Sequence, residues 1–321
     1  MAVYVNTNYS ALQGQRYLGN VQNQLTTTYQ RLSSGMRINS AKDDAAGLQI
    51  ADRLTSQING LNQGNRNAAD GIALAQTIEA GMDEISGMLQ KMRTLTVQAS
   101  NGTNTKEDRA ALSKEVAALA TEVNRIATQT TFAGKKVLNG KGKESIFGEA
   151  ANGGKNGEAG KAGDNGTMTL QVGSNKGDVI SFDFESVMFS KLTGEVKDLI
   201  GTDKVFKTDQ NSGAISVTLT KAKTDNSGES FGAIIELFDK AIGKVDGMRA
   251  DLGAIQNRLE SSIRNQSNVA ANEADARSRI RDADFAEESA NLSQQSIIQQ
   301  AAASMLMQAN TRPQLGLSLL G

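Results

Sequence analysis

The side chains in this sequence that could perform chemistry are carboxylates. Acidic residues stand as adjacent pairs at Asp43-Asp44 and Glu287-Glu288, and paired carboxylates are the catalytic groups of glycoside hydrolysis. Neighbouring residues on a helix point to different faces, so neither pair converges on a cleft. The chain has no histidine and no cysteine, and it therefore lacks the commonest general base, the commonest zinc ligands and any thiolate nucleophile. We expect no catalytic site, no metal and no cofactor.

Composition narrows the classes of partner. The 321 residues carry 34 basic and 35 acidic side chains, a net charge of −1, so no bulk field attracts nucleic acid or an anionic membrane. No apolar run approaches the roughly 18 residues of a membrane span, and Met1–Gly19 lacks the pattern of a secretory signal. Aromatic residues are 4% and proline occurs once. This profile favours a helical assembly protein, and the missing signal alone suggests a cytosolic one.

A long helix dominates the elements that the pattern predicts. From Phe231 to Leu259 apolar residues recur in alternating steps of three and four, which is the spacing of a coiled-coil seam. The same register continues to Ile280 through more polar positions that still include Val269. Such a stripe is stabilising only when other helices bury it. We therefore expect a helix over 231–280 that packs against helical partners.

Weaker helical patterns occupy the N-terminal half. One covers 8–33, with Ser34-Gly35 as its stop signal. A capping-box pattern at Ser40–Asp43 predicts the start of a second helix that runs to about Ala99. Glycine inside a helix costs about 1 kcal/mol relative to alanine, so packing must hold this helix, and its glycines would permit close helix approach. These glycines are Gly60, Gly64, Gly71, Gly81 and Gly87.

The rest of the chain completes a nearly palindromic order of elements. Thr105 caps a further helix that ends before Phe132, and a last helix over 285–310 is expected to end at Thr311-Arg312-Pro313. Residues 139–166 are glycine-rich and are predicted to form a surface insertion. The alternation over 168–184 predicts a hairpin, and that over 215–219 suggests another. The sequence thus predicts a mainly α fold, a long antiparallel helical coiled coil or bundle from both chain ends, with a small central β-hairpin region.

Both ends of the chain resemble bacterial flagellin. The N-terminal resemblance covers 20–138 and the C-terminal one lies within 249–310. The N-terminal motifs are Leu32-Ser33-Ser34-Gly35-Met36-Arg37-Ile38-Asn39, Asp43-Asp44-Ala45-Ala46-Gly47 and Asn62-Gln63-Gly64-Asn65-Arg66-Asn67-Ala68. The C-terminal motifs are Arg249-Ala250-Asp251-Leu252-Gly253-Ala254-Ile255-Gln256-Asn257-Arg258-Leu259, Asp282-Ala283-Asp284-Phe285-Ala286 and Gln308-Ala309-Asn310. The combination is specific to this family, whereas the middle of the chain is not diagnostic.

The resemblance implies a structural subunit that polymerises into the secreted filament of the bacterial flagellum. It also implies export in an unfolded state through the flagellar type III apparatus, with the chain ends folding on assembly. In the family the terminal helices form an inner-core coiled coil, here 1–43 plus 285–321. The remaining helices form an outer core, here 44–138 plus 167–284, and 139–166 is the surface insertion.

The resemblance also implies roles for particular residues. The residues that would join subunits in the inner core are Leu18, Val21, Leu25, Leu32, Leu292, Ile298, Ala302 and Met305. Two polar segments, Met36–Asp44 and Arg279–Asp284, interrupt the helices, and we call them the polar breaks. They would let subunits slide and switch between filament shapes, and the residues proposed for this role are Arg37, Asp43, Asp44, Asp282 and Asp284. The segment similar to that recognised by the vertebrate flagellin-sensing Toll-like receptor contributes Lys91, Arg93, Leu95 and Glu115. Lys91 stands where arginine is usual, and lysine lacks the planar fork of arginine, so recognition would be weakened.

The partners that the resemblance implies are further copies of the chain, sibling flagellins, the flagellar cap and junction proteins, a cytosolic export chaperone at the C-terminal end and a host Toll-like receptor. A flagellar hook–filament junction protein is the main alternative, although the continuous match through both core halves favours flagellin. Glycine-rich helices argue against a generic intracellular scaffold. The absence of histidine excludes the zinc peptidase inserted in some flagellins. Serines and threonines of 139–230 are candidates for O-glycosylation.

Overall fold

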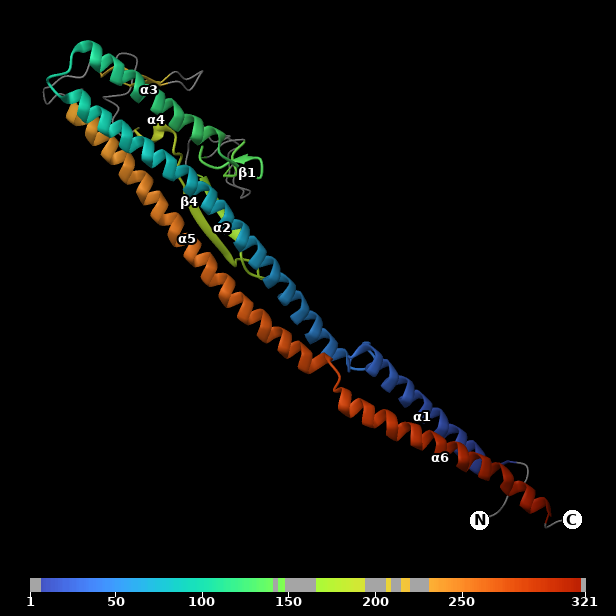
Figure 1. Ribbon diagram of the computed structural model, residues 1–321. Helices are drawn as coiled ribbons and strands as arrows, with labels where there is room; N and C mark the ends of the chain where they lie inside the picture. Colours follow the sequence, from blue (N-terminus) through green and yellow to red (C-terminus); the bar gives the residue numbers. More distant parts are fainter. Residues whose placement is uncertain are drawn as a thin grey trace. The chain divides into compact units, whose positions relative to one another are not determined.

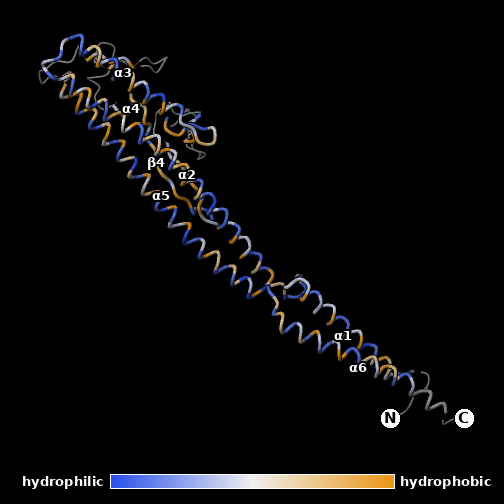
Figure 2. The backbone as a smooth tube through the Cα atoms, in the orientation of Figure 1, coloured by the Kyte–Doolittle hydropathy of each residue, from blue (hydrophilic) through white to orange (hydrophobic). Residues whose placement is uncertain are grey.

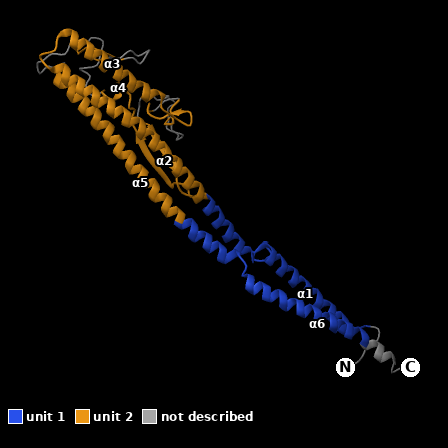
Figure 3. Ribbon diagram, in the orientation of Figure 1, with its two compact units in different colours: residues 1–59, 268–321 blue, residues 60–267 orange. Residues whose placement is uncertain are grey.

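The computed structural model describes residues 7–140, 144–147, 166–193, 206–208, 215–219 and 231–318. They form two compact units, one from 1–59 with 268–321 and the other from 60–267 (Figure 3). We call them unit 1 and unit 2. The divisions fall within two long helices, α2 (Ala45–Ser100) and α5 (Phe231–Arg281) (Figure 1). They differ from the predicted boundaries at 43/44 and 284/285, whose assignment to filament layers stays a prediction.

Unit 1 contains the first and last helices, α1 (Tyr9–Ser34) and α6 (Phe285–Ser318). The side chain of Asn8 caps α1 by accepting a 3.0 Å hydrogen bond from the Ala11 N–H. The helix ends at Gly35, whose φ of 69° lies in the left-handed region that glycine adopts without strain. The predicted helix over 8–33 and its glycine stop are confirmed.

Two predicted helix ends were wrong. The second helix begins at Ala45 rather than at Ser40, because the Ser40–Asp43 pattern closes a separate turn in which the Asp43 carboxylate accepts from the Ser40 N–H at 2.9 Å. Asp44 caps α2 instead, since its Oδ1 accepts from the Gly47 N–H at 2.9 Å. The last helix runs through Pro313 to Ser318. A proline removes one backbone donor and crowds the preceding turn, which weakens a helix without forbidding it.

In unit 2, α3 (Lys106–Gln129) has the predicted capping box, formed by Thr105 and Asp108. A short helix α4 (Phe189–Leu192) follows the strands of the central hairpin. The strands are β1 (Thr131–Phe132), β2 (Lys135–Lys136), β3 (Gly166–Gln171), β4 (Val179–Phe184), β5 (Phe206–Thr208) and β6 (Ile215–Val217). They pair antiparallel as β1-β2, β3-β4 and β5-β6, so the hairpin over 168–184 and the strand near 215–219 are confirmed.

The core of unit 2 lies where α2, α3 and α5 meet the strands. The α5 seam is buried as predicted at Phe231, Ile234, Phe238, Ala241, Val245, Leu252, Ile255 and Leu259. The facing residues of α2 include Ile78, Met82, Ile85, Leu89 and Met92, all fully buried. Figure 2 shows apolar positions recurring along both helices. Towards the end of α5 the register slips, because Ala270 is buried in unit 1 and Val269, the predicted seam residue, is exposed.

Three glycines of α2, Gly60, Gly64 and Gly71, lie against the β3-β4 hairpin. A Cβ at Gly60 would stand 2.7 Å from the Cβ of Ser174, and one at Gly64 would overlap the Val172 carbonyl. Gly81 accommodates Leu138 in the same way. Close approach was predicted correctly, but the nearest neighbour was not, since the hairpin lies closer to Gly64 and Gly71 than α5 does.

An aromatic cluster joins the strands to the helices. The Phe147 ring stacks on that of Phe184 with centroids 5.2 Å apart and meets Phe182 edge-on. Phe147 is 2% exposed, although it lies within the predicted surface insertion 139–166. For 144–147 that prediction was wrong, since a single aromatic residue anchors the segment in the core; residues 141–143 and 148–165 lie outside the described part of the chain.

Candidate functional site

The first and last helices of unit 1 form an antiparallel pair joined by polar side chains. Thr28 Oγ1 donates to Gln295 Oε1 at 3.1 Å, and Gln299 Nε2 donates to Gln22 Oε1 at 2.6 Å. Near the chain termini, Asn8 Nδ2 donates to the Ala309 carbonyl at 2.8 Å. Directional contacts of this kind permit one register between α1 and α6, because a slip of one residue would leave them all unpaired.

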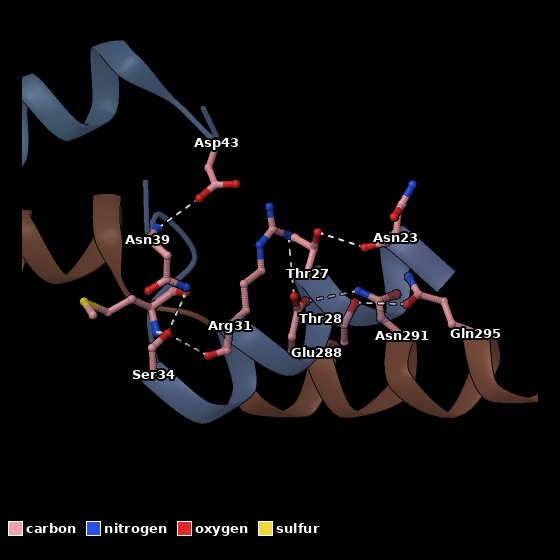
Figure 4. Close-up of polar contacts among 11 residues, drawn as sticks. Asn23, Thr27, Thr28, Arg31, Ser34, Asn39, Asp43, Glu288, Asn291 and Gln295 are labelled. Atoms are coloured by element: carbon pink, nitrogen blue, oxygen red, sulfur yellow. Dashed lines mark hydrogen bonds and ion pairs between the residues drawn. The ribbon is translucent and has the colours of Figure 1, made fainter. Parts of the chain in front are cut away.

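An ion pair lies inside the same interface (Figure 4). Arg31 Nη1 stands 3.5 Å from Glu288 Oε1, and the Glu288 side chain is only 9% exposed. Asn291 Nδ2 donates to the other Glu288 oxygen at 3.4 Å. Among the described residues, the buried Arg31 Nε has no hydrogen-bond partner. Arg31 is 33% exposed, so Glu288 is the buried partner. Such a pair gives little net stability, but losing Arg31 would leave the buried Glu288 charge uncompensated, so the pair favours one arrangement of the helices.

The predicted polymerisation residues divide by exposure. Val21, Leu25 and Ala302 are buried between α1 and α6, whereas Met305 is 70% exposed. Leu18, Leu32, Leu292 and Ile298 are half-buried. Leu306 lies against the helix where Met305 was expected, 3.3 Å from a Cβ placed at Gly14. The structure therefore uses some of these side chains within the pair and leaves others outside it.

Large apolar side chains remain exposed on this pair. They are Tyr9, Leu12, Tyr17, Tyr29, Phe285, Ile297, Met305 and Met307, with exposures from 49% to 72%. A groove of about 930 Å³ lies between the helices and is lined in part by Gly14, Tyr17 and Ala302. Many exposed apolar side chains on so small a unit mark an interaction surface.

The two polar breaks are hydrogen-bonded to each other within unit 1. The Arg37 N–H donates to the Arg281 carbonyl at 2.7 Å, and the Ala283 N–H donates to the Gly35 carbonyl at 3.0 Å. Arg37 Nη2 also donates to the Ile280 carbonyl at 2.7 Å. These bonds join the segments, whereas the sequence suggested two loops facing each other freely.

The acidic residues of the breaks serve local structure. Asp284 Oδ1 accepts from the Ala286 N–H at 2.8 Å and so begins α6. Asp282 accepts from the Ser278 hydroxyl at 2.6 Å. Hydrogen bonds from the backbone and hydroxyl of Ser40 hold the pKa of Asp43 below its ordinary value. With Asp44 capping α2, each acidic residue predicted for switching already has a partner within unit 1.

The segment predicted for receptor recognition lies in unit 2. Lys91 Nζ pairs with Glu115 at 2.9 Å, and Arg93 Nε pairs with Asp239 at 2.5 Å. The hydrogen bond that Arg93 donates to the Asp239 carboxylate raises the pKa of Arg93 above its ordinary value. The structure brings Lys91, Arg93 and Glu115 to the surface as exposed ion pairs, whereas Leu95 is 8% exposed and belongs to the core.

Sequence reasoning missed the polar partners on α6. Glu288 was considered only as half of an acidic pair, and Gln295 was not considered. A signal was present, because Glu288, Gln295, Ala302 and Ala309 are spaced by seven, which is a coiled-coil position occupied by polar and small residues. A search for apolar seams passes over such a stripe.

The fold and this interface define a class, a helical structural subunit whose terminal helices present an interaction surface. The comparisons identify its family: models of the bacterial flagellin N-terminal and C-terminal helical regions match residues 5–143 and 235–320. Flagellin D of Vibrio anguillarum is 37% identical in an alignment of 380 positions, and Flagellin A of Vibrio cholerae is 38% identical in one of 402 positions. Both alignments cover 100% of each chain. The chain belongs to the bacterial flagellin family.

One of two similar solved structures has a TM-score above 0.5 and shares the fold. A putative flagellar hook-associated protein from Vibrio parahaemolyticus is 15% identical, covers 75% of this chain and 100% of its own, and has a TM-score of 0.52. A flagellin from Bacillus cereus is 26% identical over 64% of this chain and 94% of its own, with a TM-score of 0.41. The likeness to the hook-associated protein shows a shared fold alone, whereas the flagellin relatives match the whole chain, so the junction-protein alternative is not favoured.

The protein is accordingly a structural subunit of the bacterial flagellar filament, which lies outside the cell. Within the described part of the chain, no helix is both long and apolar enough to cross a membrane. The same residues contain no cluster of three or more acidic side chains arranged to hold a metal ion.

Proposed function

We propose that the terminal helices are the part of the subunit that joins neighbouring copies. In this proposal 1–43 plus 285–321 form the inner core of the filament, and 44–138 plus 167–284 form the outer core. The observation that carries it is the set of large apolar side chains exposed on α1 and α6, of which Ile297 and Met305 are 67% and 70% exposed.

The terminal helices fold fully only when neighbouring subunits cover them. Buried side chains of α1 are limited to Val21, Leu25 and Thr28, although the helix has 26 residues. Burial of so few side chains does not offset the conformational entropy lost when a helix of this length is ordered. Export in an unfolded state and folding of the ends on assembly are consistent with this imbalance.

The proposed partners follow from the same surface. Further copies of the chain and sibling flagellins would cover the exposed faces of α1 and α6, and the cap and junction proteins would bind them at the filament ends. A cytosolic export chaperone would cover α6 before export. Neither nucleic acid nor a membrane is a partner in this proposal, and no catalytic activity is proposed.

The polar breaks and the receptor-like segment have separate roles in the proposal. The breaks, which contain Arg37, Asp43 and Asp282, act as a joint whose hydrogen bonds rearrange when the filament changes shape. For a host Toll-like receptor, Lys91, Arg93 and Glu115 supply exposed charge, but each is already engaged in an ion pair. These pairs would have to open for recognition, which agrees with the weaker binding expected from Lys91.

A matched pair of substitutions tests the assembly surface. Ile297→Asp places a charge on the exposed face of α6, and Val179→Asp places the same charge at a 46% exposed residue of unit 2. Neither side chain is buried, so both variants should fold as monomers with the helical content of the wild type. We expect filaments from Val179→Asp in a seeded polymerisation assay followed by electron microscopy, and none from Ile297→Asp. Normal filaments from Ile297→Asp would refute the proposed surface.

A further inference from the structure

The turn between α2 and α3 contains an exposed Asn-Gly dipeptide. α2 ends at Ser100 and α3 begins at Lys106, so Asn101-Gly102 lies between helices, and both residues are exposed. The Asn104 N–H donates to the Asn101 carbonyl at 3.2 Å, and the Thr103 N–H points at Asn101 Oδ1 at 3.4 Å. Among the described residues, the Gly102 N–H has no hydrogen-bond partner.

We propose that Asn101 is a site of spontaneous deamidation in the folded protein. The Gly102 backbone nitrogen attacks Asn101 Cγ, a C–N bond forms in a five-membered succinimide, and the side-chain nitrogen leaves as ammonia. Water then opens either carbonyl of the ring, which gives aspartate or isoaspartate and one new carboxylate. The step consumes only water and needs neither oxidant nor enzyme.

Glycine at position 102 removes the usual obstacle to this attack. With no Cβ, the backbone can adopt the conformations that ring closure needs. A Cβ built at Gly102 would meet nothing within 4 Å, so the surroundings do not hold the residue in place. The exposed turn also gives water free access to the succinimide.

A second Asn-Gly dipeptide serves as an internal control, because its surroundings should protect it from deamidation. Asn59-Gly60 has the same two residues but lies inside α2, where each backbone N–H donates to the carbonyl four residues earlier. The Gly60 nitrogen is therefore occupied, and Ser174 lies against that glycine. The same dipeptide should react in the turn and be protected in the helix.

The carboxylate formed at residue 101 would lie near the guanidinium of Arg109. Arg109 Nη2 stands 3.5 Å from the Asn101 carbonyl, and within the described residues the buried Arg109 Nε has no hydrogen-bond partner. The guanidinium also lies 5.3 Å from the centroid of the Phe231 ring. An aspartate at 101 would bring a negative charge close to the Arg109 guanidinium, which favours a charge-assisted contact, although the C-terminus of α2 next to it disfavours negative charge.

The experiment ages the full-length monomer in mildly alkaline buffer and follows tryptic peptides by mass spectrometry. Cleavage after Arg53, Arg66, Arg93 and Lys106 separates Asn59 in peptide 54–66 from Asn101 in peptide 94–106. We expect deamidation at Asn101 several times faster than at Asn59 in the native chain, and comparable rates at both in concentrated urea. Fragment ions separate Asn101 from Asn104, and isoaspartyl methyltransferase detects the isoaspartate product.

Two outcomes would overturn the proposal. One is a native chain in which Asn101 stays intact or reacts no faster than Asn59. The other is a Gly102→Ala variant that deamidates at the wild-type rate, because a Cβ at 102 fits the open turn but hinders ring closure. Asn101→Gln is the matched blank for the 94–106 peptide, since ring closure from the longer side chain is much slower.

Discussion

Replacing Gly64 by alanine is expected to destabilise unit 2, although alanine is the better helix former. In an exposed helix the exchange gains about 1 kcal/mol. At Gly64 the added Cβ would lie 2.7 Å from the Val172 carbonyl carbon and overlap its oxygen, and 3.2 Å from Gln266 Oε1. The obstacle is the backbone of the β3-β4 hairpin, which cannot rotate away as a side chain could.

The size of the Gly64→Ala effect follows from the cost of overpacking and the opposing gain in helix propensity. Overpacking a well-packed site costs about 1–3 kcal/mol, and the upper part of that range applies where backbone must move. After the propensity gain is subtracted, Gly64→Ala should lower the free energy of unfolding by about 1–2 kcal/mol. Gly87 provides the matched control, because it lies in the same helix and a Cβ there meets nothing within 4 Å. Gly87→Ala should raise the free energy of unfolding by about 1 kcal/mol.

Urea unfolding of the full-length monomer, followed by far-ultraviolet circular dichroism, measures both changes on the transition of unit 2. The midpoints should move in opposite directions while the slopes stay unchanged. Stabilisation by both substitutions would show that the hairpin does not press on Gly64 as the structure indicates. Destabilisation by both would show that helix propensity is not the governing factor at Gly87.

Two further predictions concern local structure. Gly134→Ala in the β1-β2 turn should cost about 1–2 kcal/mol in urea unfolding, because Gly134 has a φ of 79° and nothing within 4 Å of a Cβ, so conformation alone is responsible. Hydrogen bonds from the side chain and backbone of Thr105 lower the pKa of Asp108 below its ordinary value of 3.8. The stability that this capping contact gives is therefore complete above the unfolded-state pKa and is lost as pH falls through the folded-state pKa. Asp108→Asn should flatten that acid limb of the stability profile, and an unchanged limb would contradict the assignment.

Helices with a strong apolar period were predictable, and their ends were less so. The α5 seam from Phe231 to Leu259 was correct because burial follows the predicted period at every seam position except Met248, which is half-buried. The start of α2 was placed at Ser40 because Ser40 and Asp43 have the spacing of a capping box, and the structure uses that spacing for a separate turn. The burial of Phe147 was not predicted either, since one aromatic residue in a glycine-rich stretch gives no periodic signal.

The tertiary partners of the candidate site could not be derived from local pattern. The sequence indicated that glycines of α2 permit close approach, but the hairpin at Val172 became their neighbour through pairing far along the chain. In unit 1 the apolar residues Val21 and Leu25 were identified by their seam. Glu288 and Gln295 were not, because polar residues at a coiled-coil position are recognised only when the partner helix is known.

The antiparallel pairing of α1 with α6 has a consequence for the timing of synthesis. The hydrogen bond between Asn8 and Ala309 joins residues 301 positions apart, and that between Gln22 and Gln299 joins residues 277 apart. Contacts so remote along a polypeptide form late, because the intervening loop must close first. A ribosome releases α6 after the other described helices, so α1 cannot form its contacts with α6 until nearly all of these residues have been translated. The order of residues along the chain thus keeps its first helix without this partner through most of synthesis.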